Sequence, residues 1–449
     1  MGKYIIGNIV HAVQVNKLEI LTNHLIYVNG NIIERCSPFS EAEFKPQSHE
    51  EVIYLTQTQF LFPGFVDTHI HAPQYPNTGI FGESTLLDWL QKYTFPTEGR
   101  FKDISNAKDV YSKLIKRQLN NGTTTSSYYG TIHVPATIEL AKLCLEQNMR
   151  GRIGRVCMEK FCPGFLNDGS IESDIQFIEE MERLDPSGAM VKPIITPRFA
   201  PSCEFSTLKG LGELAEKKKL SIQTHVSENL NEIKWVKELF KTKSYCDVYD
   251  EAGLLKKDTI LAHAIHLTND ELNLIKERDC GISHCPDSNA ALASGIAPVK
   301  KYLRHKLKVG LGTDVSAGCT VSVLKNARLA LLMSRLLTQR ESESLEIDKL
   351  NKDKSSSLTV DEALSMATLG GAQVMSMDKE IGNFEIGKKL DAQIVDIASD
   401  NSEIDIFDMS LPSNEIDRVR YYLNKWVYIG DDRNTVCVFV DGKKVVSKI

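Results

Sequence analysis

Five histidines occupy positions where short β-type segments end. These ends are His69-Ile70-His71, His225, His263 and His284. A single histidine is more often a packed core or surface residue than a metal ligand. The chain contains only 11 histidines, however, and chance does not readily place five of them at strand ends. The set therefore indicates a metal site.

The types of these residues favour zinc. Residues two apart on an extended segment point to the same side, so His69 and His71 present both imidazoles together. A third imidazole from His225 and the carboxylate of Asp314 complete a nitrogen and oxygen ligand set that suits Zn²⁺. Iron and manganese accept the same ligand types and stay open as alternatives. The 10 cysteines include no CxxC pair, so no thiolate ligand is expected.

Glu228 lies three residues after His225. At the start of a loop or helix, this spacing returns a carboxylate toward the metal. A glutamate beside a metal-activated water is suited to move protons, so we interpret Glu228 as a general acid–base group. On its own, it would be equally well explained as a helix-start glutamate stabilised by the helix dipole. The surrounding histidines favour the catalytic interpretation.

The elements that must position these residues alternate between short strands and longer, mostly helical segments. We expect eight strands, at residues 61–67, 123–129, 152–157, 190–196, 220–224, 259–262, 280–283 and 308–312. Strand–helix alternation repeated in this way predicts a TIM-type (β/α)8 barrel of the α/β class. Barrel enzymes carry their chemistry at the carboxyl ends of the strands. The histidines, Asp314 and the pair Arg198-Phe199 all stand at such ends.

Both ends of the chain carry a β-hairpin pattern. Asn29-Gly30 joins two β runs near the start, and Asp441-Gly442 joins two more near the end. Both dipeptides favour the positive φ angles of a type I′ turn. We therefore expect a small β-sandwich domain built from residues 1–61 and 385–449, with the barrel over 62–384. Residues 340–357, rich in Ser, Glu, Lys and Asp, are expected to form an exposed, mobile insertion.

Composition argues against several classes of partner. The formal net charge of −6 and a pI near 6.0 argue against a nucleic-acid surface. No apolar run is long enough to span a bilayer, and the first residues lack the apolar core of a signal peptide. Scattered cysteines indicate reduced thiols rather than a disulfide framework. We expect a cytoplasmic protein that binds neither nucleic acid nor membrane.

Several segments match known patterns around the candidate ligands. Residues 63–71 (PGFVDTHIH), 284–289 (HCPDSN) and 310–314 (GLGTD) resemble signatures of the metal-dependent amidohydrolase superfamily. Residues 71–75, 87–96, 121–125, 196–199, 224–229 and 430–434 resemble, within it, the eukaryotic-type guanine deaminase family. The matches extend from about residue 60 to the end, so the resemblance does not depend on a single motif. Asp287 departs from the family's asparagine; we expect it near the pocket mouth, where it bears on fine specificity.

The resemblance implies a role for each site residue. It implies one zinc ion per chain, bound by His69, His71, His225 and Asp314. It implies Glu228, Asp314 and His263 as catalytic residues, with Glu228 the proton shuttle and His263 a hydrogen-bond partner of the reacting water. The implied substrate contacts are Gln74, Arg198, Phe199, His225, Glu228 and Asp314. A homodimer is also implied.

The implied reaction is the hydrolysis of guanine to xanthine and ammonia in purine catabolism or salvage. The enzyme would then be a hydrolase acting on a C–N bond of a cyclic amidine. An arginine such as Arg198 donates well to O6 of guanine, whereas adenine presents an amino group there and leaves donors unpaired. Phe199 suits the face of a planar ring.

Two alternatives stay open. An amidohydrolase acting on 8-oxoguanine, an aminotriazine or an adenine-type compound would use the same ligands. A non-catalytic scaffold of this fold would lack the ligands, whereas this sequence has them all. The cytidine-deaminase type, which needs a Pro-Cys-x-x-Cys motif, is excluded because the motif is absent.

Overall fold

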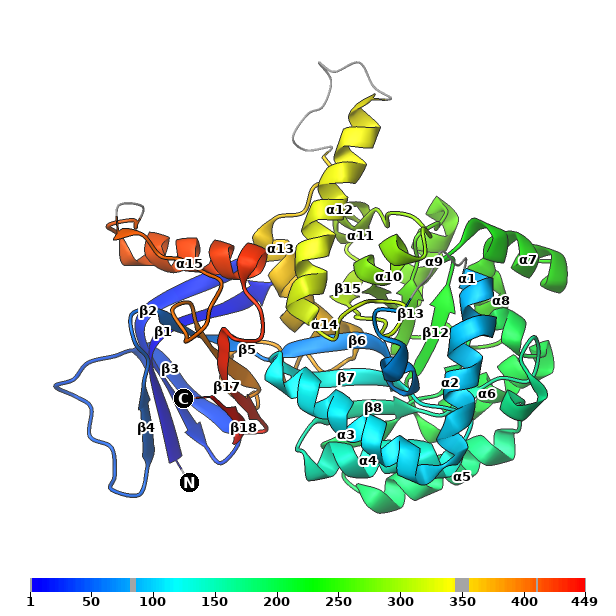
Figure 1. The fold of residues 1–449 in the computed structure, drawn as a ribbon, viewed down its shortest axis with the longest axis horizontal. Coiled ribbons are helices and arrows are strands. Elements are labelled where there is room, and N and C mark those ends of the chain that lie inside the picture. The colour runs from blue at the N-terminus through cyan, green and yellow to red at the C-terminus, as the bar shows by residue number, and fades with distance from the viewer. Residues whose placement is uncertain (1, 81–85, 344–354, 409–410, 449) are drawn as a thin grey trace.

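A computed structural model of the chain describes residues 2–80, 86–343, 355–408 and 411–448. Two sheets organise it: a mixed sheet built from both chain ends, and a parallel sheet surrounded by helices (Figure 1). Most of the insertion expected at 340–357 lies outside the described residues. Among the described helices, none combines the length and the apolar character needed to cross a bilayer.

The parallel sheet contains the strands expected from the sequence. Within the described residues its order is β10-β8-β7-β6-β15-β14-β13-β12, and each neighbouring pair is parallel. The strands are β6 (Phe65–His71), β7 (Thr123–Tyr129), β8 (Arg150–Gly154), β10 (Val191–Pro193), β12 (Ile222–Val226), β13 (Thr259–His263), β14 (Gly281–His284) and β15 (Lys308–Leu311). A short pair, β9 (Val156–Cys157) and β11 (Thr196–Pro197), follows β8 and β10 in the chain. The predicted parallel α/β arrangement is confirmed, with strand ends shifted by a few residues.

Helices follow most of these strands and lie around the parallel sheet (Figure 1). In α6 (Phe205–Lys218), Leu208, Leu211 and Leu214 recur at helical spacing and form one buried face of the helix. The helix ends before Lys219, whose backbone is in the left-handed conformation. The helices are α1 (Leu86–Trp89), α2 (Phe95–Gly99), α3 (Ile104–Asn120), α4 (Val134–Glu146), α5 (Ile171–Leu184), α6 (Phe205–Lys218), α7 (Leu230–Phe240), α8 (Tyr245–Glu251), α9 (Asn269–Glu277), α10 (Pro286–Ala291), α11 (Val299–Arg304), α12 (Val323–Glu343), α13 (Val360–Ser365), α14 (Gly371–Val374) and α15 (Glu415–Ile429).

The mixed sheet joins strands from the two chain ends, drawn in blue and red at one side of Figure 1. Its order is β18-β17-β16-β5-β1-β2-β3, and β4 pairs in parallel with β1. The strands are β1 (Gly2–Gln14), β2 (Lys17–Asn29), β3 (Ile32–Pro38), β4 (Glu51–Tyr54), β5 (Gln59–Pro63), β16 (Ala392–Asp396), β17 (Thr435–Val440) and β18 (Lys443–Ser447). The pairing of β5 with both β1 and β16 brings the start and end of the chain into one sheet.

The two predicted hairpins both form, but only one turns where expected. Asp441 and Gly442 have φ angles of 51° and 75°, as a type I′ turn requires. At the other hairpin, Asn29 still pairs with Ile32, so the turn consists of Gly30 and Asn31. Gly30 has a φ of 64°, whereas Asn29 stays in the strand. The expected Asn-Gly turn is therefore displaced by one residue, because strand pairing continues through the asparagine.

A buried ion pair fastens the parallel sheet to the mixed sheet. Arg150 begins β8 and directs Nη2 to Asp391 Oδ1 at 3.1 Å and Nε to Asp391 Oδ2 at 3.3 Å. Asp391 also accepts the backbone N–H of Asp441 at 2.8 Å. Because the Arg150 and Asp391 side chains are each only 2% exposed, neither charge has water as a substitute partner.

Candidate active site

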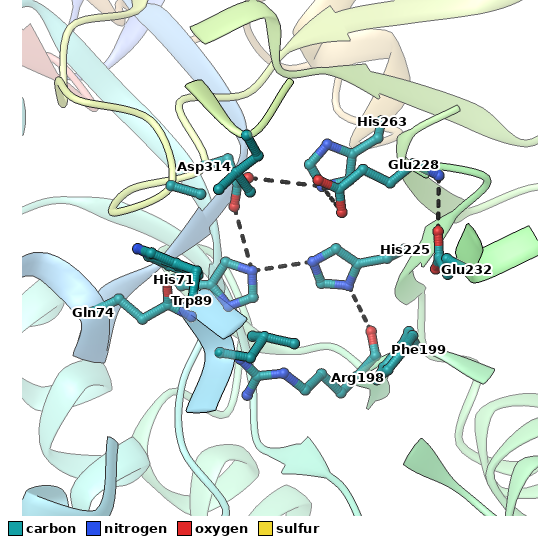
Figure 2. A pocket seen from close by; sticks show the side chains of 13 residues that line it. His71, Gln74, Trp89, Arg198, Phe199, His225, Glu228, Glu232, His263 and Asp314 are labelled. Carbon is teal, nitrogen blue, oxygen red and sulfur yellow. Dashed lines mark hydrogen bonds and ion pairs between the residues drawn. The ribbon is translucent and has the colours of Figure 1, made fainter. Parts of the chain in front are cut away.

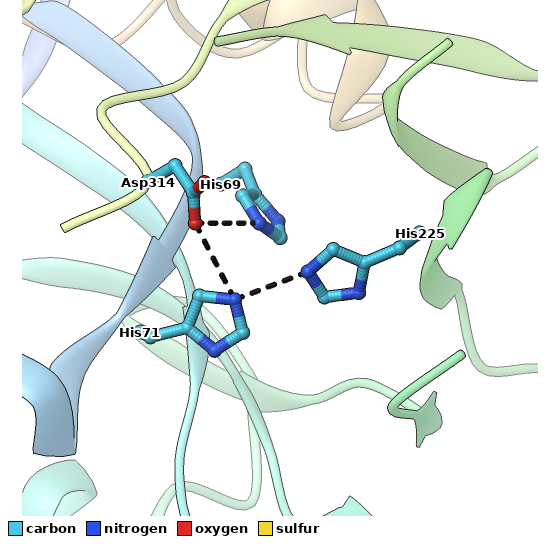
Figure 3. A group of neighbouring side chains, drawn as sticks. All are labelled: His69, His71, His225 and Asp314. Carbon is cyan, nitrogen blue, oxygen red and sulfur yellow. Dashed lines mark hydrogen bonds and ion pairs between the residues drawn. The ribbon is translucent and has the colours of Figure 1, made fainter. Parts of the chain in front are cut away.

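Three histidines and one aspartate converge at the carboxyl ends of the parallel strands (Figure 3). His69 and His71 end β6, His225 lies near the end of β12, and Asp314 follows β15. One nitrogen or oxygen atom of each residue lies within 4.8 Å of the others. Asp314 Oδ1 lies 3.2 Å from Nε2 of His69 and 3.4 Å from Nε2 of His71. The four residues proposed as ligands are thus brought together.

The state of these imidazoles fits a metal ion. Nε2 of His71 lies 3.1 Å from Nε2 of His225, and Nε2 of His69 faces Asp314 Oδ1 at 3.2 Å. The N–H at Nδ1 of His225 donates to the carbonyl oxygen of Arg198 at 2.6 Å, which leaves the Nε2 lone pair facing the cluster. Burial lowers the pKa of His71 and His225 well below the ordinary value. Neutral imidazole is the form that binds metal.

The backbone around the cluster is strained at two site residues. His263 and Asp314 have φ angles of 69° and 47°, a region that side-chain-bearing residues rarely adopt. The backbone N–H of Asp314 donates to the carbonyl oxygen of His69 at 2.9 Å, and Asp314 accepts the N–H of Gly318 at 2.7 Å. Such conformations persist where surrounding contacts enforce them, and they concentrate at functional sites.

Glu228, two residues past the end of β12, and His263, at the end of β13, face the cluster (Figure 2). His263 Nε2 lies 3.6 Å from Glu228 Oε2 and 3.7 Å from Asp314 Oδ2, and its Nδ1 contacts Asn289 Oδ1 at 2.9 Å. Ser294 donates its hydroxyl to Glu228 Oε1 at 3.2 Å. Asp314 therefore directs one oxygen to the histidine cluster and the other to His263.

Burial and neighbouring charges set the ionisation of these groups. Burial, with smaller contributions from Glu232 and Asp314, raises the pKa of Glu228 to about 7. Burial alone would lower the pKa of His263, but the carboxylates of Glu228 and Asp314 outweigh it and raise that pKa. Burial opposes ionisation of Asp314 too, yet the hydrogen bond and charge of His69 hold its pKa below the ordinary value. A carboxyl group poised near neutrality is suited to proton transfer.

A pocket of about 460 Å³ opens over the cluster. Its lining combines the predicted polar residues with an apolar wall that was not predicted from the sequence. The lining residues are His71, Gln74, Trp89, Leu90, Arg198, Phe199, His225, Glu228, Glu232, His263, Leu292, Asp314 and Ala317. Trp89, Leu292 and Ala317 pack together in one small apolar cluster. Pockets lined by apolar and aromatic side chains with a few placed polar groups are typical of small-molecule sites.

Two residues at strand ends or motifs do not line this pocket. His284 ends β14 and is buried, but it belongs to neither the cluster nor the lining. Asp287 accepts the backbone N–H of Cys319 at 2.7 Å and its thiol at 3.3 Å. Its side chain thus braces the loop after Asp314, two residues from the lining residue Ala317, and its effect on fine specificity stays a prediction.

Two buried carboxylates beside the pocket, Glu98 and Glu232, were not predicted from the sequence. Glu98 accepts Nη1 of Arg198 at 2.7 Å and Nη2 at 3.0 Å, and it accepts Nε2 of Gln74 at 2.9 Å. Glu232, in a capping box with Asn229, accepts the backbone N–H of Glu228 at 3.0 Å. The capping spacing was readable from the sequence, whereas no local pattern distinguishes Glu98 from a surface glutamate.

Comparison with known proteins places this geometry in a family. The model of the amidohydrolase family matches residues 60–445, which include all four residues of the cluster. The chain belongs to the amidohydrolase family. The superfamily resemblance of the sequence motifs is thereby confirmed.

Relatives within the amidohydrolase family are similar over nearly the whole chain. A probable guanine deaminase of Schizosaccharomyces pombe is 44% identical, over 98% of this chain and 82% of its own length. The guanine deaminase of Rattus norvegicus is 40% identical, over 98% of this chain and 96% of its own. A crystal structure of guanine deaminase from C. acetobutylicum with bound guanine in the active site superposes with a TM-score of 0.88. That protein is 35% identical, and the match covers 99% of this chain and 100% of the other.

Proposed function

We propose that this chain is a hydrolase that converts guanine and water to xanthine and ammonia. The observation that carries the proposal is the convergence, in one pocket, of the His69–His71–His225–Asp314 cluster with Glu228. The relatives that are similar over almost the full chain bear the name guanine deaminase. This reaction would be a step in purine catabolism or salvage.

The cluster holds one metal ion per chain in this proposal. Three neutral imidazoles and one carboxylate form the ligand set that favours zinc over harder cations. Two observations support this fit: Nε2 of His71 faces Nε2 of His225 at 3.1 Å, and Nε2 of His69 faces Asp314 Oδ1 at 3.2 Å. When bound, zinc supplies a water whose pKa is lowered to about 7 and a Lewis acid beside the substrate.

The chain's own groups then move the protons. The Asp314 and His263 side chains hold the attacking water near C2 of guanine, supported by their 3.7 Å approach to each other. Glu228 accepts a proton from that water and delivers it to ring N3 as the new C–O bond forms. The same carboxylate next takes the remaining proton from the new hydroxyl at C2 and passes it to the amino group at C2. The C–N bond breaks with its electron pair leaving on nitrogen, the C2 carbonyl forms, and ammonia leaves with xanthine as the second product.

Recognition of the base is assigned to the part of the pocket lined by Gln74, Arg198 and Phe199. Arg198 donates to O6, Gln74 contacts the same edge, and Phe199 lies against the ring. His225, Glu228 and Asp314 approach the reacting edge, which gives the six substrate contacts that the sequence indicated. The common position of these side chains in the pocket lining supports the assignment.

The experiment is ammonia release from a panel of purines, pyrimidines and triazines by the purified protein. Guanine is expected to be the preferred substrate, and xanthine the product. Preference for 8-oxoguanine, an aminotriazine or an adenine-type compound would transfer the same chemistry to another substrate. A protein that contains zinc but releases no ammonia from any of them would instead be a scaffold.

The closure of the barrel, the domain bounds, the cellular location and the oligomeric state are proposals as well. We infer that the parallel sheet closes into a (β/α)8 barrel over residues 62–384. Support comes from the parallel bridge between Ile195, just past β10, and Ile222 of β12. Residues 1–61 and 385–449 form the small β-sandwich domain in this scheme. We further propose that the protein is cytoplasmic and that it forms a homodimer. Sedimentation of the purified protein tests the dimer.

A further inference from the structure

Helix α2 supports Arg198 from behind the pocket. Its Glu98 carboxylate receives two guanidinium N–H groups of Arg198, at 2.7 and 3.0 Å. The Phe95 ring lies 5.5 Å from Cζ of the same guanidinium. Phe95 and Glu98 are three residues apart and so share one face of the helix. The guanidinium is thereby held by a bidentate ion pair and a ring contact from one short segment.

Glu98 orients a second pocket residue as well. It accepts Nε2 of Gln74 at 2.9 Å, which turns the amide nitrogen toward Glu98 and leaves Oε1 on the other side. Glu98 is only 1% exposed and is absent from the pocket lining, whereas Gln74 and Arg198 both line it. Glu98 therefore acts on a ligand through these two side chains.

The pairing also changes the charge that a ligand meets. A buried guanidinium without a partner attracts anions strongly, because charge interactions are weakly screened inside a protein. With Glu98 in place, Arg198 remains a hydrogen-bond donor, but the pair carries no net charge. Guanine is neutral near neutral pH, whereas xanthine is more acidic and exists partly as an anion. A neutral donor pair favours the substrate over the ionised product.

We propose that Glu98 is a positioning residue that aims Arg198 and Gln74 and, by neutralising Arg198, limits binding of anionic xanthine. The proposal rests on the proposed function, since it assumes guanine as substrate and xanthine as product. It adds that selection against the product depends on a residue that never contacts the ligand.

The test is Glu98→Gln, measured on the zinc-loaded protein. The amide keeps one acceptor but opposes its NH₂ to a guanidinium N–H, so Arg198 is misaligned and its charge unpaired. We expect kcat/KM for guanine to fall about tenfold to a hundredfold, the loss expected for a misaligned charge-assisted hydrogen bond. Inhibition by xanthine at mildly alkaline pH should become stronger, and zinc content should stay unchanged. A merely structural role would weaken both ligands together.

Glu98→Asp distinguishes the effect of Glu98 on the orientation of Arg198 from its effect on the charge of Arg198. It keeps the carboxylate but shortens its reach, so Arg198 stays paired in charge but is misaligned. Guanine kcat/KM should fall, and xanthine, which carries the same O6, should inhibit no more strongly than in the parent. Unchanged guanine turnover in Glu98→Asp would overturn the positioning role. Stronger xanthine inhibition in this variant would overturn the role of charge.

Asp174→Asn is the matched control, because it neutralises another buried carboxylate paired with an arginine, Arg155, at 3.5 Å, away from the pocket lining. Neither guanine turnover nor xanthine inhibition should change in it. Parallel weakening of both ligands in Glu98→Gln, or the opposed shifts appearing in Asp174→Asn, would overturn the inference alone. Absence of ammonia release from guanine by the parent protein would overturn the proposed function, and this inference with it.

Discussion

Glu228 Oε2 lies 3.6 Å from Nε2 of His263, and Glu228 is not one of the four residues of the candidate metal cluster. Proton transfer and metal binding are therefore separable by mutation. Glu228→Gln is nearly isosteric and should leave the cluster intact. Its amide accepts no proton, so turnover of guanine should fall by about 10²–10⁴-fold or more. Steady-state ammonia release and zinc analysis of the same preparation measure both properties.

Glu271→Gln is the matched control for that variant, because Glu271 is another buried glutamate but lies outside the pocket lining. It should retain turnover. A Glu228→Gln protein with kcat within about tenfold of the parent would assign the shuttle elsewhere, to Asp314 or His263. Loss of zinc from it would mean that Glu228 supports the metal site.

Removing the Arg198 side chain should weaken guanine turnover without affecting zinc. The loss in kcat/KM should be about 2–4 kcal/mol, because O6 loses its donor. Zinc should stay because His225 is held by the backbone carbonyl of Arg198, which Arg198→Ala retains. Turnover like that of the parent would show that the base binds in another orientation.

Metal and activity should disappear together in His69→Ala and in His225→Ala, since each removes one of four ligands. Elemental analysis of the parent should find about one zinc per chain. His305→Ala, which changes a histidine whose Nδ1 contacts the Lys301 carbonyl on α11, should keep both. Two metals per chain, or none in active protein, would contradict the mononuclear site.

Asp391→Ala should destabilise the protein, since it leaves the Arg150 charge buried without its main partner. Breaking such a pair from one side costs about 3–5 kcal/mol in the free energy of unfolding. The double variant Arg150→Met/Asp391→Ala removes both charges and should recover part of that loss. Denaturant titration of the parent and the two variants measures this; a single variant as stable as the parent would show that the sheets are joined by other contacts.

Much of the site could be predicted from the sequence because its determinants are local. His-x-His on a strand directs both imidazoles to one side whatever surrounds it, since alternation is a property of the extended backbone. The motif matches also indicated His225, Asp314, Glu228 and Arg198 before their positions were known. The strand–helix alternation predicted a parallel sheet, and its carboxyl ends are where these residues meet.

The tertiary structure decided what depends on contacts between distant segments. The turn at Gly30 was displaced because the pairing of β2 with β3, rather than the turn dipeptide, set the register. Asp287 accepts a hydrogen bond from Cys319 because the loop after β15 lies against it. Glu98 and Arg198 are 100 residues apart, and nothing around either one predicts their pairing. Sequence spacing determines which face a side chain occupies, but burial in a shared interior determines which partner it must find.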